Sequence, residues 1–217
     1  MHVRHLFVEG KKMSKSLGNF ITVRELLEEG YDPASIRHQL ISSHYRGELN
    51  FTRDGLKASA AAVQRILDFE ARLDAAVVDD AAEASKLPEL AESARGSFQS
   101  AMDNDFNSAD AMAAIFVLVG GVNAELDSRG VVSSSDRDAV VVVLRSMDEV
   151  LGLLEVAHAS RSVDDDMAAY VEQKIQERAD ARANKDFATS DAIRDELAEK
   201  DIVLEDGADG TRWKVVG

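Results

Sequence analysis

The sequence contains no cysteine, which excludes disulfide bonds and thiolate metal sites within this chain and fits a cytoplasmic protein. It has only two prolines, Pro33 and Pro88, and its many alanines favour helices. No apolar run approaches the ~20 residues that a membrane-spanning helix needs. The first eight residues are too short and too polar for a secretory signal. These absences predict a mainly α-helical, cytoplasmic protein without a membrane partner.

The net charge of −15 is unevenly distributed along the chain. Residues 1–65 carry 10 lysines and arginines against 7 acidic residues, residues 66–166 carry 7 against 21, and residues 167–217 carry 8 against 12. The first segment is therefore suited to facing phosphates. The acidic middle fits either a solvated helical bundle or the general acidity of a salt-adapted proteome.

Hydrophobic periodicity and capping residues predict the order of the elements. A short strand is expected over 3–8, and a hairpin over 202–205 and 212–216. The valines at 140–143 also fit a strand, but the length of that segment favours a helix. Residues 44–51 are predicted to be a loop, 75–86 a linker or a loosely held turn, and 157–166 a second linker. Helices are expected over about 23–29, 33–43, 53–74, 88–102, 109–127, 139–154, 166–184 and 187–199.

The stretch GKKMSKSLGNF at 10–20 predicts a short basic loop. Gly10 and Gly18 allow backbone mobility on either side of it. Lysine ammonium groups and serine hydroxyls on such a loop are suited to holding a polyphosphate while negative charge builds on it. A solvated basic turn is the alternative interpretation.

The pentapeptide at 12–16 resembles the KMSKS signature of class I aminoacyl-tRNA synthetases. In that family the loop closes over ATP while the aminoacyl-adenylate forms. The resemblance implies a catalytic role for Lys15 and, less directly, for Lys12. It also implies contacts with ATP, bound with Mg²⁺, from Lys12, Met13, Ser14, Lys15 and Ser16.

Further stretches resemble cysteinyl-tRNA synthetase, and they cover essentially the whole chain in the order of that family. They are KMSKSLGNF at 12–20, HYR at 44–46 with LN at 49–50, DNDFN at 103–107, RANKDFA at 182–188, IRDEL at 193–197, LED at 204–206 and GTRW at 210–213.

The resemblance implies how the chain is organised. Residues 1–20 would close the catalytic domain and 21–74 would form a stem-contact fold. Residues 80–157 would form a DALR-type helical anticodon-binding bundle, and 165–217 a small α+β domain with a β-hairpin that helps to read the anticodon. The family's HIGH signature, cysteine pocket and zinc belong to an N-terminal domain outside these residues. We therefore expect the C-terminal part of a monomeric cysteine–tRNA ligase, inactive alone and with no metal site of its own, whose partners are ATP, cysteine and tRNA(Cys).

Contacts with tRNA are also expected from the resemblance. Arg46 offers a fork to phosphate, although it could equally belong to a packed corner between a helix and a loop. Trp213, the only tryptophan, could stack on an unpaired base or anchor the hairpin. The candidate tRNA-binding residues are His44, Tyr45, Arg46, Arg182, Lys185, Asp206, Thr211, Arg212 and Trp213.

Residues 103–107 also resemble the start of a calcium loop. Ser108 stands where that loop needs glycine and Ala114 where it needs glutamate, so calcium binding is rejected. Two other functions remain open. One is a free-standing tRNA-binding module without catalysis. The other is a cysteine ligase of the mycothiol pathway. The tail at 165–217, which resembles a domain that reads the anticodon, argues against this second function.

Overall fold

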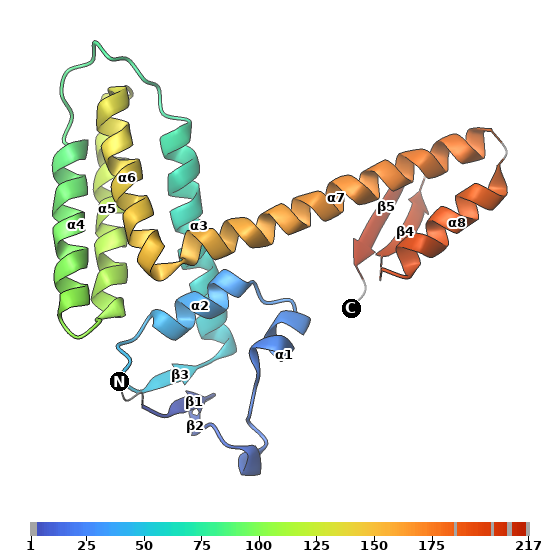
Figure 1. The fold of residues 1–217 in the computed structure, drawn as a ribbon, viewed down its shortest axis with the longest axis horizontal. Helices are drawn as coiled ribbons and strands as arrows, with labels where there is room; N and C mark the ends of the chain where they lie inside the picture. Colours follow the sequence, from blue (N-terminus) through green and yellow to red (C-terminus); the bar gives the residue numbers. More distant parts are fainter. Residues whose placement is uncertain (1–3, 185, 201, 208–209, 216–217) are drawn as a thin grey trace. The chain divides into compact units, whose positions relative to one another are not determined.

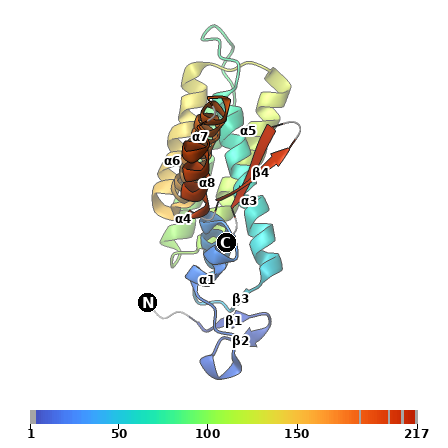
Figure 2. The ribbon, with the colours of Figure 1, turned by 90° about the vertical axis from the view of Figure 1, so that its right-hand side faces the viewer.

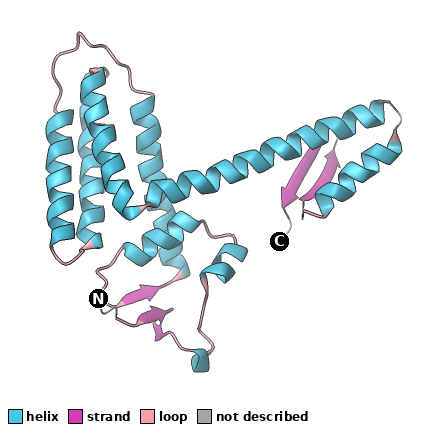
Figure 3. Cartoon of the chain, in the orientation of Figure 1, coloured by secondary structure: helices cyan, strands magenta, loops and turns pink. Residues whose placement is uncertain are grey.

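The fold was analysed in a computed structural model of the chain, which describes residues 4–184, 186–200, 202–207 and 210–215. The chain divides into two compact units, Met1–His158 and Ala159–Gly217. Helices dominate both units (Figure 3), so the predicted mainly α fold is confirmed.

The first unit begins with a small sheet that carries the basic loop at residues 10–20, which we call the lysine loop. Strand β1 (Leu6–Val8) pairs antiparallel with β2 (Lys11–Lys12) and parallel with β3 (Leu49–Phe51). Between β2 and β3 lie a 3-10 turn, η1 (Lys15–Leu17), and the helices α1 (Val23–Glu28) and α2 (Pro33–Ile41). A small apolar core made of Leu26, Ile36, Phe51 and Leu56 joins these elements to α3 (Arg53–Asp74).

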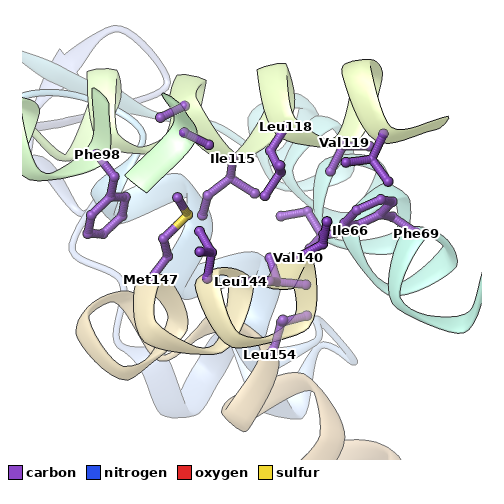
Figure 4. Close-up of a cluster of buried hydrophobic side chains, with 14 of the residues drawn as sticks. Ile66, Phe69, Phe98, Ile115, Leu118, Val119, Val140, Leu144, Met147 and Leu154 are labelled. Carbon is purple, nitrogen blue, oxygen red and sulfur yellow. The ribbon is translucent and has the colours of Figure 1, made fainter. Parts of the chain in front are cut away.

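Three further helices form a bundle with α3: α4 (Leu87–Asp103), α5 (Ser108–Arg129) and α6 (Ser134–Leu151). Figures 1 and 2 show the sheet at one end of the first unit and the loop between α3 and α4 at the other. The bundle core is apolar (Figure 4), and burying each large side chain in it contributes about 1.5–3 kcal/mol. Its labelled members are Ile66, Phe69, Phe98, Ile115, Leu118, Val119, Val140, Leu144, Met147 and Leu154.

Helix α5 is long and apolar enough to cross a membrane by length and composition alone. Its residues Met112, Ile115, Leu118, Val119 and Val122 are, however, buried in the bundle core. The core helix of a soluble protein passes the same test, so the apolar character of α5 is explained by its packing.

The second unit contains the later part of α7 (Leu153–Ala183), α8 (Phe187–Ala198) and the antiparallel hairpin of β4 (Ile202–Gly207) and β5 (Gly210–Val215). Its core is formed by Val171, Ile193, Leu197 and Ile202. The hairpin predicted at the C-terminus is present. The side chain of Asp186 caps α8 by accepting a hydrogen bond from the backbone of Thr189 at 3.1 Å.

Two predicted elements were wrong. Residues 49–51 lie in β3 rather than in a loop, because they pair with β1, more than forty residues earlier in the chain. Residues 157–166, expected as a linker, lie inside the continuous helix α7.

Two further predictions need correction. Helix α6 begins at Ser134 and ends at Leu151, where Gly152 adopts a left-handed φ of 61°, so it is shifted from the predicted 139–154. Residues 75–86 are not helical, as expected, but they are not loosely held. The carboxylate of Asp80 accepts hydrogen bonds from the backbone and hydroxyl of Ser134, at 3.0 and 2.7 Å.

Candidate functional site

The lysine loop begins at a tight turn between β1 and β2. Glu9 and Gly10 both have left-handed backbones there, with φ of 48° and 77°. The backbone N–H of Gly10 donates a hydrogen bond to Oδ1 of Asn50 at 2.8 Å, and the N–H of Glu9 donates to the carbonyl of Phe51 at 3.1 Å. The turn is therefore fixed by β3, which precedes α3 in the chain.

The KMSKS residues follow β2 and fold into a compact loop. The N–H of Met13 donates to the carbonyl of Leu6 at 2.9 Å. The hydroxyl of Ser14 caps η1 by accepting from the N–H of Leu17 at 3.2 Å, and Gly18 ends it with a φ of 65°. The backbone of the loop is thus specified by local capping, and glycine suits the left-handed position at 18.

The carboxamide of Asn19 joins the end of the loop to its start. Its Oδ1 accepts from the N–H of Ser14 at 2.9 Å. Its Nδ2 lies 3.3 Å from the carbonyl oxygen of Lys11 and 3.1 Å from that of Lys12, and it donates to both. One side chain therefore bonds three backbone groups of the loop.

The candidate catalytic lysines project outward from this frame. Lys12 and Lys15 are exposed, and Lys15 Nζ lies 5.6 Å from the centroid of the Phe20 ring. The hydroxyls of Ser14 and Ser16 are 3.2 Å apart. The structure therefore brings all five residues of the motif into one loop, with two exposed positive charges on a fixed backbone.

A cavity of about 490 Å³ lies beside the loop. Lys11, Asn19, Phe20, Glu25 and Arg53 are among the residues that line it. The backbone N–H of Thr22 donates a hydrogen bond to the carboxylate of Glu25 at 2.7 Å, and this bond holds the pKa of that carboxyl below its usual range. Among the described residues, no three histidine, aspartate or glutamate side chains gather as a metal site would require.

The candidate tRNA residues His44, Tyr45 and Arg46 meet Asp105, which lies in the turn between α4 and α5. The Tyr45 hydroxyl donates to Asp105 Oδ1 at 2.6 Å, and Arg46 Nε lies 2.8 Å from Asp105 Oδ2. The rings of His44 and Tyr45 stack with their centroids 4.8 Å apart. We call these four residues the Asp105 corner. Arg46 therefore contacts a turn of the bundle, while Tyr45 is half-buried and Arg46 itself exposed, and the contact of Arg46 with phosphate stays a prediction.

The Asp105 corner is electrostatically coupled and conformationally strained. The hydrogen bond from Tyr45 lowers the pKa of Asp105, and the hydrogen bond to Tyr45 raises the pKa of Arg46. Asp105 and Phe106 have φ of 59° and 53°, in the left-handed region that non-glycine residues adopt at a cost. The Arg46 side chain is still 65% exposed, so its guanidinium remains accessible.

The second unit holds the remaining candidate residues. Trp213 packs with the unit's core, and its Nε1 lies 3.2 Å from Glu172 Oε1 on α7, to which it donates a hydrogen bond. The tryptophan thus anchors the hairpin through α7 as well as through the core. Arg182 is exposed near the end of α7 and Thr211 is half-buried on β5. In the hairpin register Asp206 faces Thr211 and Arg212 faces Glu205, while Lys185 lies outside the described residues.

A second polar contact joins α7 to α8 at Glu196. Lys174 Nζ lies 3.0 Å from Glu196 Oε2, and the Tyr170 hydroxyl donates to Glu196 Oε1 at 2.5 Å. The hydrogen bond from Tyr170, followed by that from Lys174, lowers the pKa of Glu196.

The sequence did not predict the positioning roles of three residues, Asn19, Asn50 and Asp105. Asn19 belongs to the quoted motif, but its role depends on the path of the loop backbone. Asn50 and Asp105 act on segments 40 and 59–61 residues away, which no local pattern encodes.

Three family models match the chain in sequence order. Residues 1–61 match a model described as "tRNA synthetases class I (C) catalytic domain". Residues 97–155 match the "DALR domain", and residues 164–213 match the "Cysteinyl-tRNA ligase anticodon binding domain".

Curated relatives extend this similarity to nearly the whole chain. A protein of Solibacter usitatus named cysteine–tRNA ligase is 38% identical over 99% of this chain and 45% of its own length. Relatives with the same name from Koribacter versatilis and Idiomarina loihiensis are each 39% identical over 99% of this chain, and 48% and 44% of their own lengths. The chain thus spans a little under half the length of the curated relatives it matches.

Proposed function

The chain belongs to the cysteinyl-tRNA synthetase family and corresponds to the C-terminal part of its relatives, and from this we propose that the full-length protein is a cysteine–tRNA ligase. It would form cysteinyl-adenylate from cysteine and ATP, releasing pyrophosphate. A ribose hydroxyl at the 3′ end of tRNA(Cys) would then attack the adenylate. This chain would supply the lysine loop and surfaces that bind the tRNA.

The observation that carries the proposal is the geometry of the lysine loop. The loop backbone is fixed by the Ser14 cap and by Asn19, while Lys12 and Lys15 remain exposed. Charges held in advance where negative charge develops stabilise a transition state most effectively, because little reorganisation remains to be done. Lys15 and Lys12 would act on the phosphates of ATP, which carries Mg²⁺, and Met13, Ser14 and Ser16 would complete the ATP contacts.

We assign the zinc expected for the family to the part of its relatives that precedes this chain. The chain has no cysteine, and its described residues contain no cluster of histidine and carboxylate ligands. The donors that the family uses for zinc would therefore come from that preceding part.

Recognition of tRNA is proposed for two surfaces. On the first unit, Arg46 keeps an exposed guanidinium beside His44 and Tyr45, so it can contact phosphate while still bonded to Asp105. On the second unit we keep Arg182, Lys185, Asp206, Thr211, Arg212 and Trp213 as candidates for the anticodon. The anticodon-domain match at 164–213 supports this second surface.

The proposed domain organisation follows the sequence analysis. Residues 1–20 end the catalytic domain, 21–74 form the stem-contact fold, 80–157 form the anticodon-binding bundle and 165–217 form the anticodon-recognition domain. The matched ranges 97–155 and 164–213 support the last two, whereas the catalytic-domain match extends to residue 61 and so overlaps the proposed stem-contact fold. We further propose that the full-length enzyme is a cytoplasmic monomer.

The test is cysteine-dependent exchange between ATP and pyrophosphate by the full-length protein. Lys15→Ala should lower the exchange rate constant by about 10²–10³-fold, the usual loss when one group that stabilises the transition state is removed. Lys57→Ala is the matched control, because Lys57 lies exposed on the surface of α3, where it pairs with Asp54 at 3.3 Å. Absence of exchange by the wild-type full-length protein, with retained tRNA binding, would favour a non-catalytic tRNA-binding module. Exchange by the 217-residue chain alone would contradict the assignment of the amino-acid pocket elsewhere.

A second measurement addresses tRNA directly. Binding to tRNA(Cys) should weaken as salt rises, and a changed anticodon should weaken it further. Arg46→Ala should reduce the slope of the logarithm of the binding constant against the logarithm of salt concentration by about one, the value for one lost phosphate contact. The preference for the cognate anticodon should not change. Binding that is indifferent to the anticodon would remove the support for the surface around Trp213.

A further inference from the structure

We propose that Asn19 is a positioning residue for adenylate formation, which holds the KMSKS loop in the shape that aims Lys15 at the phosphates of ATP. This inference rests on the proposed function of the loop. It concerns a residue outside the pentapeptide, one that has no need to touch ATP itself.

The side chain of Asn19 forms hydrogen bonds with the edge strand β2. Strand β2 lies at an edge of the sheet, with β1 on one side only. The Nδ2 group of Asn19 donates to the carbonyls of Lys11 and Lys12 in this edge strand, at 3.3 and 3.1 Å. Because successive carbonyls of a strand point to opposite edges, only the carbonyl of Lys12 faces the free edge of β2, and there the carboxamide takes the hydrogen-bonding position of a neighbouring strand.

Hydrogen bonds hold the backbone on both sides of Lys15, and the carboxamide of Asn19 makes one of them. Its Oδ1 accepts from Ser14, the residue immediately before Lys15, at 2.9 Å. The carbonyl of Lys15 accepts from the N–H of Gly18 at 3.2 Å, next to Asn19. The backbone on both sides of Lys15 is thus held, which leaves its side chain as the main moving part.

The set of hydrogen bonds made at position 19 requires an asparagine side chain. The site needs one acceptor towards Ser14 and donors towards two carbonyl oxygens, and a carboxamide supplies both. Aspartate would keep the acceptor but place a carboxylate oxygen against two carbonyl oxygens. Alanine would leave three backbone groups of an exposed loop to water. Either change would let the loop adopt other conformations. The enzyme would then have to order the loop in every catalytic cycle, at a cost in conformational entropy.

Hydrogen exchange on the 217-residue chain tests whether Asn19 holds the loop. Asn19→Ala and Asn19→Asp should each increase the exchange rate of the Ser14 amide by at least about tenfold, because that amide loses its acceptor or its fixed geometry. Asn123→Ala is the matched control, since Asn123 accepts a 3.0 Å hydrogen bond from Arg72 in the bundle. Unchanged Ser14 exchange in both Asn19 variants would overturn the inference, whatever the activity of the full-length protein.

Kinetics of the full-length protein test whether that hold positions Lys15. Asn19→Ala should lower kcat for ATP–pyrophosphate exchange by about 10–100-fold, with KM for cysteine unchanged. In a Lys15→Ala background the same substitution should cost less than about threefold, because Lys15, the side chain that Asn19 is proposed to position, is absent. An equal loss in both backgrounds would indicate a general structural role and would overturn the inference. A wild-type enzyme without exchange would instead refute the proposed function, and the amide measurement would still show whether Asn19 holds the loop.

Discussion

The hydroxyl of Tyr45 donates a 2.6 Å hydrogen bond to the carboxylate of Asp105, 60 residues further along the chain. This bond connects the segment after α2 to the turn between α4 and α5. The lysine-loop part of the first unit and its helical bundle are therefore joined by a specific polar contact as well as by apolar packing. Because the turn is strained at Asp105 and Phe106, the contact also stabilises an otherwise unfavourable backbone.

Asp105→Ala should loosen the turn between α4 and α5. The substitution removes the acceptor for Tyr45 and Arg46 and places alanine in a left-handed conformation that it rarely adopts. Limited proteolysis at 103–107 should become several-fold faster, while Asp105→Asn, which retains an acceptor and tolerates that conformation, should have a smaller effect. Asp103→Ala, at the exposed end of the same turn, serves as the control. Equal cleavage of Asp105→Ala and wild type would show that the corner does not hold the turn.

Gly55→Ala should destabilise the first unit by about 1–2 kcal/mol, although alanine is the better helix former. A Cβ at Gly55 would lie 2.2 Å from Nε2 of Gln39 and 2.9 Å from Oγ1 of Thr52. Gln39 is buried, and its Nε2 donates to the carbonyl of Thr52 at 3.1 Å, so it cannot move without losing that bond. Urea denaturation would measure the change.

The matched control for this substitution is Gly96→Ala in α4. Among the described residues, no atom other than those of the neighbouring helix backbone lies within 4 Å of a Cβ built at Gly96. This variant should therefore gain up to about 1 kcal/mol from helix propensity alone. If Gly55→Ala were stabilised as much as Gly96→Ala, the predicted clash with Gln39 would be wrong.

Local sequence signals account for most of the helices but not for the contacts between them. Thr22, Thr52 and Asp186 each cap the helix expected to follow, because a cap needs only its own side chain and the next turn. Strand β3 was missed because three residues form a strand only beside β1.

The same distinction applies to the candidate site. The KMSKS motif is contiguous, so the sequence identified its members, and the structure places them in one loop. Asn19 gains its role only from the path of the backbone between 11 and 19. Arg46 gained a carboxylate partner from the turn at 103–107, which the sequence marked only by its resemblance to the family and to a calcium loop.

His38 should make folding sensitive to pH just below neutrality. Its side chain is buried, its Nδ1 lies 2.9 Å from Ser59 Oγ, and its buried Nε2 has no hydrogen-bond partner among the described residues. Burial lowers the pKa of His38, so the unfolded chain takes up a proton at about pH 6.5 while the folded chain does not. The contribution of neutral His38 to stability is complete above about pH 6.5 and is lost as the pH falls towards the folded-state pKa.

The measurement is the urea midpoint between pH 7.5 and 5.5. The fall in midpoint over this range should be smaller in His38→Gln than in the wild type, even though the variant starts from lower stability. His158→Gln is the control, because His158 is exposed and pairs with Glu70 at 2.7 Å. An identical pH dependence in His38→Gln and wild type would exclude His38 as its source.

Asp148 should be needed for α7 to begin where it does. Its Oδ1 accepts from the N–H groups of Leu153 and Leu154, each at 2.8 Å, and its Oδ2 accepts from that of Glu155 at 2.9 Å. A carboxylate that bonds three free N–H groups at a helix N-terminus also interacts favourably with the helix dipole, so Asp148→Ala should cost about 1–2 kcal/mol. Hydrogen exchange at 153–155 should accelerate in this variant and less so in Asp148→Asn, whereas the exposed neighbour Glu149→Ala should stay within about 0.5 kcal/mol of wild type. Since α7 continues from the first unit into the second, unchanged exchange at 153–155 in Asp148→Ala would mean that packing of Leu153 and Leu154, rather than this cap, sets the start of the helix.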